Sequence, residues 1–169
     1  MYRANQIVAQ VLSELALRIR SGVSTGELDE YAEVRVRELG GEPAFKGYRG
    51  FPASLCVSLN EEIVHGIPSK KRRLAPGDVV SMDLGAKLEG FYGDSAVTVP
   101  VAPVDPQVER LLQVTEESLQ HAIEQCQVGK RVGDISCAVQ RHVERSGFSV
   151  VRDFVGHGIG AALHEDLQV

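Results

Sequence analysis

Two aspartates interrupt two neighbouring apolar segments near the middle of the chain, and they constrain the fold more than any other feature. Asp83 follows the apolar residues at 79–82, and Asp94 lies inside a second apolar segment. We predict strands over 79–84 and 91–99. Because a buried carboxylate without a partner costs several kcal/mol, two of them in one apolar hairpin need a common explanation.

A divalent cation explains both aspartates most simply. The expected connection between the strands contains Gly85 and Gly90, and the aspartates are 11 residues apart. If a hairpin sets them on one face of neighbouring strands, their oxygens can converge on one or two metal ions. The alternative is that one aspartate caps a turn while the other faces water.

Length, charge and cysteine content indicate one globular domain of the cytoplasm. The chain has 169 residues and a net charge of −5, which implies no general affinity for polyanions. Its three cysteines form no Cys-x-x-Cys pair, and no segment has the length of a membrane span or the pattern of a signal peptide. The basic segment Lys70–Arg73 is typical of a solvated surface turn, with a ribosome or nucleic-acid contact as the alternative.

Helices are predicted at about 4–20, 24–39, 105–127 and 129–147 from apolar periodicity and end signals. Ser24 and Glu27 match a capping box, and Asp105 precedes a proline at the first helical position. The two helix pairs repeat with a constant offset of 107 residues. The matched pairs are Gly22 and Gly129, Gly26 and Gly133, Leu28 and Ile135, Val36 and Val143, and Gly40 and Gly147.

The repeat predicts a unit of two helices followed by strands, present twice, although chance matches between glycines are the alternative. The first unit covers about residues 1–101 and includes a strand at 55–60. The second covers about 104–169, with a strand-like segment at 148–155. A second hairpin would end near residue 207, so we expect the second unit of this chain to be incomplete and to lack further metal ligands.

Three histidines are candidates for the site. His157 lies among glycines, which leave its ring accessible, and a histidine beside carboxylates suits a mid-row divalent ion. A hydrogen-bonded core histidine is the alternative. His65 lies in a similar His-Gly-Ile context, and His164 follows near the end of the sequence. His121 and His142 fall on predicted helices, and we expect them at the surface.

Several motifs together resemble type I methionine aminopeptidases, and they cover essentially the whole chain. They are Gly47-Tyr-Arg-Gly-Phe-Pro52, Ser58-Leu-Asn-Glu-Glu-Ile-Val-His-Gly-Ile-Pro68, Met82-Asp-Leu-Gly85, Gly90-Phe-Tyr-Gly-Asp-Ser95, Gly156-His-Gly-Ile-Gly160 and His164-Glu165. The resemblance implies the α+β pita-bread fold, in which helix pairs and a curved antiparallel sheet form two pseudo-twofold halves. It also implies removal of the initiator methionine from nascent chains.

The resemblance assigns roles to individual residues. Two divalent ions (cobalt, manganese, iron or zinc) would be held by Asp83, by Asp94 as the bridge, and by His157. His65 and His164 would contact the substrate and the developing tetrahedral intermediate. The methionine side chain would bind against three residues, Tyr48, Phe51 and Cys56. Burial in the core is the alternative for each of these three. The implied partners are the N-terminal methionine peptides of nascent chains, with the ribosome left open and with no membrane or specific nucleic acid.

The sequence also departs from the family pattern. Phe45 stands where some members have cysteine, and Leu163 where an aromatic residue often occurs. The family's two glutamate ligands would lie beyond residue 169, and Glu165 and Asp166 are too close to His164 to be assumed substitutes. We therefore expect weak or no catalysis from this chain. The alternatives are a non-catalytic binding module of the same fold and a peptidase that cleaves before proline.

Overall fold

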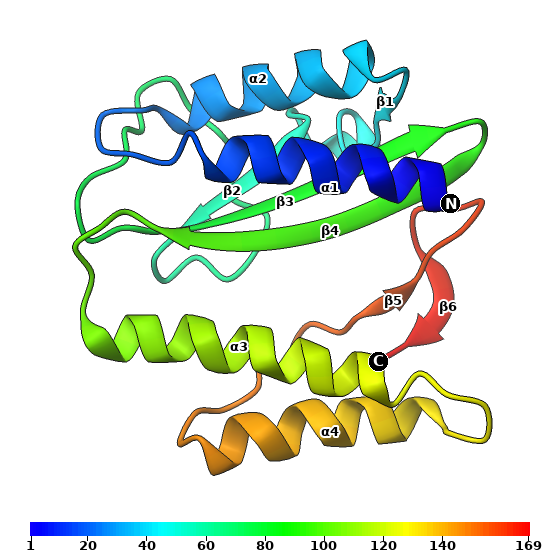
Figure 1. The fold of residues 1–169 in the computed structure, drawn as a ribbon. Coiled ribbons are helices and arrows are strands. Elements are labelled where there is room, and N and C mark those ends of the chain that lie inside the picture. Colours follow the sequence, from blue (N-terminus) through cyan, green and yellow to red (C-terminus); the bar gives the residue numbers. More distant parts are fainter. The chain divides into compact units, whose positions relative to one another are not determined.

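The computed structural model describes all residues from 1 to 169, and they form two compact units. The first unit contains residues 1–104 together with 159–164, and the second contains 105–158 together with 165–169. Figure 1 shows the helices and strands of both units, coloured along the sequence. Each unit is described by itself below.

Two helices of the first unit cover one face of its sheet (Figure 1). Helix α1 spans Tyr2–Ala16 and packs on the central hairpin, and α2 spans Thr25–Glu38. The predicted capping box is present, because the Ser24 hydroxyl accepts from the Glu27 amide and the Glu27 carboxylate accepts from the Ser24 amide. The first helix ends four residues before its predicted end.

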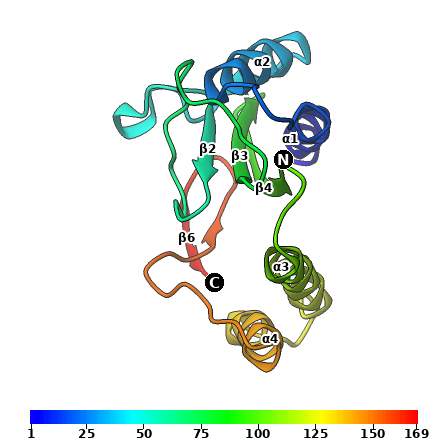
Figure 2. The ribbon, with the colours of Figure 1, turned by 90° about the vertical axis from the view of Figure 1, so that its left-hand side faces the viewer.

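The sheet of the first unit is antiparallel and is built around one long strand. Strand β3 pairs with β1 and β2 along one edge and with β4 along the other. The sheet is seen nearly end-on in Figure 2, with α1 and α2 on one side of it. The strands span Glu42–Pro43 (β1), Leu55–Leu59 (β2), Val79–Leu88 (β3) and Phe91–Pro100 (β4).

The central hairpin is longer and its turn tighter than predicted. Strand β3 continues through Gly85, which we had placed in the connection, and only Glu89 and Gly90 join it to β4. Both turn residues have positive φ, 51° and 84°, as a two-residue turn of type I′ requires. Gly85 is instead explained by packing, because an added Cβ would lie 2.5 Å from Cε1 of Phe45.

Residues alternate between the two faces of this sheet, so that successive residues of β3 lie in turn under the helices and on the opposite face. The face under the helices carries Val80, Met82 and Leu84 of β3, all 0% exposed. It is part of one hydrophobic core whose other main members are Val8, Val11, Leu15, Leu28, Val36, Leu55 and Val57. Asp83 therefore points away from this core, on the opposite face.

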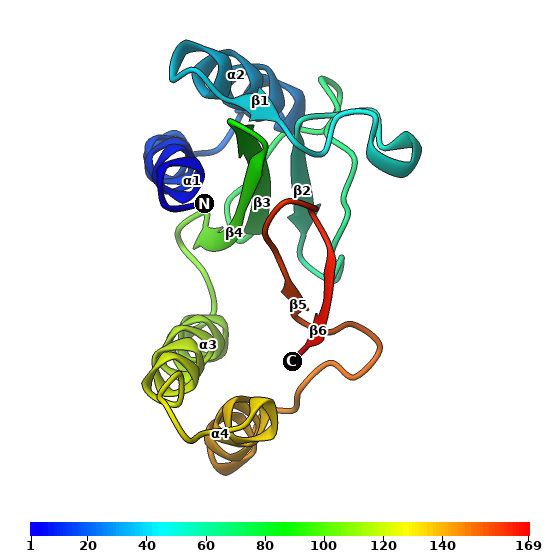
Figure 3. The same ribbon diagram turned by 90° about the vertical axis from the view of Figure 1, so that its right-hand side faces the viewer.

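The second unit contains a helix pair and a short hairpin. Helix α3 spans Pro106–Glu124, α4 spans Val132–Arg145, and the strands β5 and β6 span His157–Gly158 and Glu165–Gln168. Figure 3 shows α3 and α4 packed side by side. The strand predicted at 148–155 is wrong, because these residues form no regular element.

The predicted repeat of helix pairs is confirmed by the helix boundaries. Helix α4 begins and ends 107 residues after α2. The matched glycines also share their conformation: φ is 88° at Gly22 and 91° at Gly129, and it is 83° at Gly40 and 84° at Gly147. Residues with a side chain rarely adopt these angles, so glycine is required at the same points of both pairs. None of the helices has the length and apolar character needed to cross a membrane.

Candidate metal and substrate site

The strand register places the two aspartates on the same face of the sheet. Asp83 is paired with Ala96, and Asp94 is paired with Gly85. Because residues 94 and 96 of one strand point the same way, Asp83 and Asp94 lie diagonally opposite each other on the face away from the helices. The structure therefore confirms the predicted juxtaposition, and neither aspartate is a turn cap.

The electrostatics of this pair fit a cation. Burial, together with the charge of the nearby Asp94 and a hydrogen bond with it, raises the pKa of Asp83 to about 8. Two half-buried carboxylates this close repel each other unless a proton or a cation lies between them. Carboxylate oxygens are also ligands that divalent ions accept, so the donor set fits a metal.

An apolar cluster lies beside the aspartates on the same face. Cys56 on β2 is the direct register partner of Asp83 and is 4% exposed. Burial, followed by the charges of Asp83 and Asp94, raises the pKa of its thiol to about 12, so the thiol is neutral. The cluster contains Phe45, Cys56 and Leu163, with Ala44, Tyr48, Phe51, Tyr92 and Ile159 packed against it.

This cluster brings together all three residues predicted to receive methionine. Both departures from the family pattern, Phe45 and Leu163, belong to it as well. Tyr92 and Ile159 were not predicted as site residues. Tyr92 could have been found from its position two residues before Asp94, which puts both side chains on one face of β4.

Asp29 is a third residue near the site that was not predicted. Its carboxylate on α2 accepts hydrogen bonds from the backbone amides of Ser54 and Leu55, at 2.8 and 2.9 Å. Burial raises its pKa despite these two bonds. Asp29 therefore fixes the start of β2 directly before Cys56.

Tyr48 contacts His164 within the first unit. The Tyr48 hydroxyl lies 3.0 Å from Nδ1 of His164, and the two rings are stacked with centroids 5.4 Å apart. When the hydroxyl donates to Nδ1, the proton of a neutral imidazole lies on Nε2. His164 is exposed, so this nitrogen can face a substrate.

His157 lies on β5 in the second unit. Its Nδ1 is 3.0 Å from the carbonyl oxygen of Gly158. A carbonyl only accepts, so in this contact Nδ1 carries the proton. No group of three or more His, Cys, Asp or Glu side chains is arranged to hold a metal ion, so the full predicted ligand set of Asp83, Asp94 and His157 stays a prediction.

The remaining histidines differ in their surroundings. His65 is exposed in the loop between β2 and β3 and has a positive φ of 62°. His121 is exposed on α3, as expected, whereas His142 on α4 is half-buried, with Nε2 2.9 Å from Oε2 of Glu117. The ring centroids of His121 and His142 are 4.7 Å apart.

A family model described as metallopeptidase family M24 matches residues 1–169. The chain belongs to this family. It is 50% identical over 169 residues to methionine aminopeptidase 1 of Bacillus subtilis and 46% identical to methionine aminopeptidase of Clostridium acetobutylicum, and it spans 68% of the length of each. Within M24 it therefore groups with the methionine aminopeptidases, as the motifs indicated.

Solved M24 structures confirm the pita-bread fold. The crystal structure of methionine aminopeptidase from Thermotoga maritima matches with a TM-score of 0.97 and 43% identity, covering 99% of this chain and 68% of that one. Prolidase from Pyrococcus furiosus matches with a TM-score of 0.84 at 21% identity, covering 98% of this chain and 48% of that one. The prolidase shares the fold, while the relatives named above with 43% identity or more are methionine aminopeptidases.

Proposed function

We propose that this M24 chain removes N-terminal methionine from peptides and nascent proteins in the cytoplasm, using two divalent ions such as manganese or cobalt. The observation that carries the proposal is the carboxylate pair Asp83 and Asp94 beside the buried Cys56 on one sheet face. This arrangement supplies the two things the reaction needs, an anionic metal site and an apolar surface for a thioether.

The apolar cluster orients the substrate. Methionine is unbranched and polarisable, so it packs well against aromatic rings and a neutral thiol. Tyr48, Phe51 and Cys56 receive its side chain in this proposal. The raised pKa of Cys56 keeps this surface uncharged at neutral pH, so binding a methionine side chain there does not desolvate a thiolate.

The polar residues act on the scissile peptide. Asp83 and Asp94 would hold the metal ions, and His157 would supply a nitrogen ligand. A bound divalent ion supplies Lewis-acid activation of water and of the scissile carbonyl. His164, whose Nδ1 contacts the Tyr48 hydroxyl, holds a proton on Nε2 and donates it in a hydrogen bond to the substrate carbonyl. His65 donates a second hydrogen bond to the same group.

The test is release of free methionine from the peptide Met-Ala-Ser with manganese present. We expect slow release that stops in Asp94→Asn, because a carboxylate that would hold the metal ions is lost, and that is slower still from Leu-Ala-Ser. The longer Bacillus subtilis relative serves as the positive control for the assay. Manganese and peptide binding without any release would refute the proposal and support a binding module instead. Preferential cleavage of a Met-Pro bond would support the peptidase specific for proline.

A further inference from the structure

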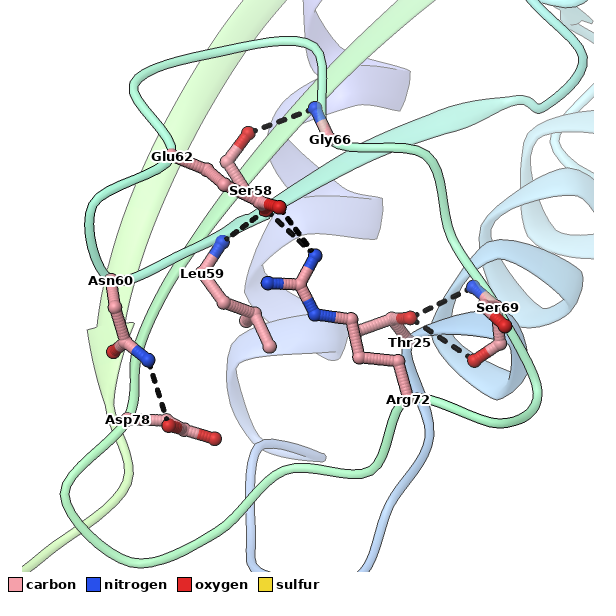
Figure 4. Close-up of polar contacts among 9 residues, drawn as sticks. All are labelled: Thr25, Ser58, Leu59, Asn60, Glu62, Gly66, Ser69, Arg72 and Asp78. Atoms are coloured by element: carbon pink, nitrogen blue, oxygen red, sulfur yellow. Dashed lines mark hydrogen bonds and ion pairs between the residues drawn. The ribbon is translucent and has the colours of Figure 1, made fainter.

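The loop between β2 and β3 carries His65, and hydrogen bonds join its first residues to its last. The Asn60 side chain donates to Oδ1 of Asp78 at 3.0 Å (Figure 4). It also accepts from the Val79 amide at 2.9 Å. The Asn60 amide also donates to the carbonyl of Val79 at 2.9 Å. These bonds close the base of the loop but lie five residues or more from His65.

Gly66 pins the loop on the C-terminal side of His65. Its amide donates to Oγ of Ser58 at 3.0 Å, and its carbonyl accepts from the Val57 amide at 2.9 Å. A Cβ at this position would lie 2.1 Å from the Val57 carbonyl oxygen, so only glycine fits. His65 itself has a positive φ of 62°, a conformation that needs support from its surroundings.

Glu62 is the matching anchor on the N-terminal side. Its Oε2 accepts from the Leu59 amide at 3.0 Å and from Nη1 of Arg72 at 2.7 Å, and Oε1 lies 2.8 Å from the same nitrogen (Figure 4). The Arg72 guanidinium, with the Leu59 amide, holds the pKa of Glu62 below its usual range. The side chain is therefore ionised at neutral pH and binds two parts of the loop.

Arg72 is itself fixed to the first turn of α2. Its carbonyl accepts from the amide of Thr25 at 2.9 Å. The Thr25 hydroxyl donates to the carbonyl of Ser69 at 3.2 Å and accepts from its amide at 2.9 Å (Figure 4). Thr25 is fully buried, so this series of contacts connects helix α2 to the loop through Arg72 and Glu62.

We propose that Glu62 and Arg72 are positioning residues, whose ion pair fixes the turn that presents His65 to the substrate. This inference rests on the proposed function only for the role of His65 in the reaction. The pair acts through the backbone, because Glu62 and Gly66 hold the chain on either side of His65. A side chain at the tip of a loop can orient a hydrogen bond only if its backbone is held.

The proposal also assigns a role to the basic segment Lys70–Arg73. Besides Arg72, Lys70 pairs with Glu30, and Arg73 donates to the Gly22 carbonyl at 2.7 Å. Three of the four cations therefore have partners within the same unit. The segment acts as a brace between α2 and the loop, and this use favours the solvated-turn interpretation over a ribosome or nucleic-acid contact.

The first arm of the test measures the loop directly and needs no activity. Glu62→Gln keeps an acceptor for the Leu59 amide but removes the charge. We expect amide hydrogen exchange at Val57 and Gly66 to become about tenfold faster, because a charge-assisted bond is lost. Glu89→Gln is the matched control, since it breaks the exposed ion pair with Arg3 elsewhere in the unit.

The second arm measures catalysis. In Glu62→Gln and Arg72→Met we expect kcat for Met-Ala-Ser to fall about tenfold while KM changes little, because His65 acts on the reacting carbonyl. Arg72→Lys should restore part of the loss. The double variant should be no slower than either single variant, since both remove the same ion pair.

The outcomes separate this inference from the proposed function. If wild-type protein releases no methionine but the amides of Val57 and Gly66 exchange faster in Glu62→Gln, the proposed function is wrong. The positioning role of the Glu62–Arg72 ion pair is then still supported. Unchanged exchange at these two amides would refute the claim that the Glu62–Arg72 ion pair fixes the loop. So would equal acceleration of amides throughout α1 and the sheet, because that pattern reports a general loss of stability. Unchanged kcat despite faster exchange would overturn the link to His65.

Discussion

The Asp83–Asp94 pair makes the metal-free protein less stable as the pH rises. The pKa of Asp83 is raised from its ordinary 3.8 to about 8. The folded state therefore binds more protons than the unfolded state between these two pH values. The contribution of Asp83 to the free energy of unfolding is fully present below about pH 4 and is lost as the pH rises through about 8. At about 1.4 kcal/mol for each pKa unit, the full effect is roughly 6 kcal/mol, and about half of it falls between pH 5 and pH 7.

The assay is urea unfolding of the chelated protein at pH 5 and pH 7, compared with Asp83→Asn. Other groups titrate in both proteins, so the informative quantity is the difference between their unfolding free energies. From pH 5 to pH 7, we expect the free energy of unfolding of Asp83→Asn to rise relative to that of the wild type by about 2 to 3 kcal/mol. Manganese at pH 7 should stabilise the wild type and leave the variant much less affected. A difference that stays constant with pH would refute the assignment of these aspartates to one repelling pair.

Two further predictions concern groups outside the metal site. The pKa of Glu14 is held low by hydrogen bonds from Arg35 and Tyr31, so its stabilising effect is present above its ordinary pKa of 4.5 and is lost as the pH falls further. Glu14→Gln should therefore destabilise the protein in urea by a constant amount above pH 5 and by progressively less below it, and a difference that grows in acid would contradict this. Iodoacetamide at pH 8 should modify the exposed Cys126 much faster than the buried Cys56, whose pKa is about 12, and equal rates by peptide mass spectrometry would contradict the burial of Cys56.

The helix pairs of both units could largely be predicted because their local signals agree with the tertiary structure. The capping box at Ser24 and the glycines after each helix fixed the ends of α2 and α4 to within one to three residues. The aspartates were found because each is polar at a position where apolar residues surround it. Family motifs added the candidate histidines, which no periodicity could have selected.

The failures have physical causes. Gly85 was assigned to a turn because glycine is common there, whereas in the fold it makes room for the Phe45 ring, a contact 40 residues away. The segment at 148–155 has the composition of a strand but no paired neighbour, and a strand needs a partner for its backbone groups. The Glu62–Arg72 bond depends on a loop path that the sequence does not encode locally.

The alternation along β3 ties the stability of the protein to its chemistry. Successive residues of this one strand belong in turn to the hydrophobic core and to the site, with Met82 and Leu84 on one side and Asp83 on the other. A slip of one residue would bury the carboxylate under the helices and expose the core side chains. The two-residue turn at Glu89 and Gly90 prevents such a slip, so a single insertion in this hairpin would disable folding and catalysis together, while substitutions that keep the register can change one without the other.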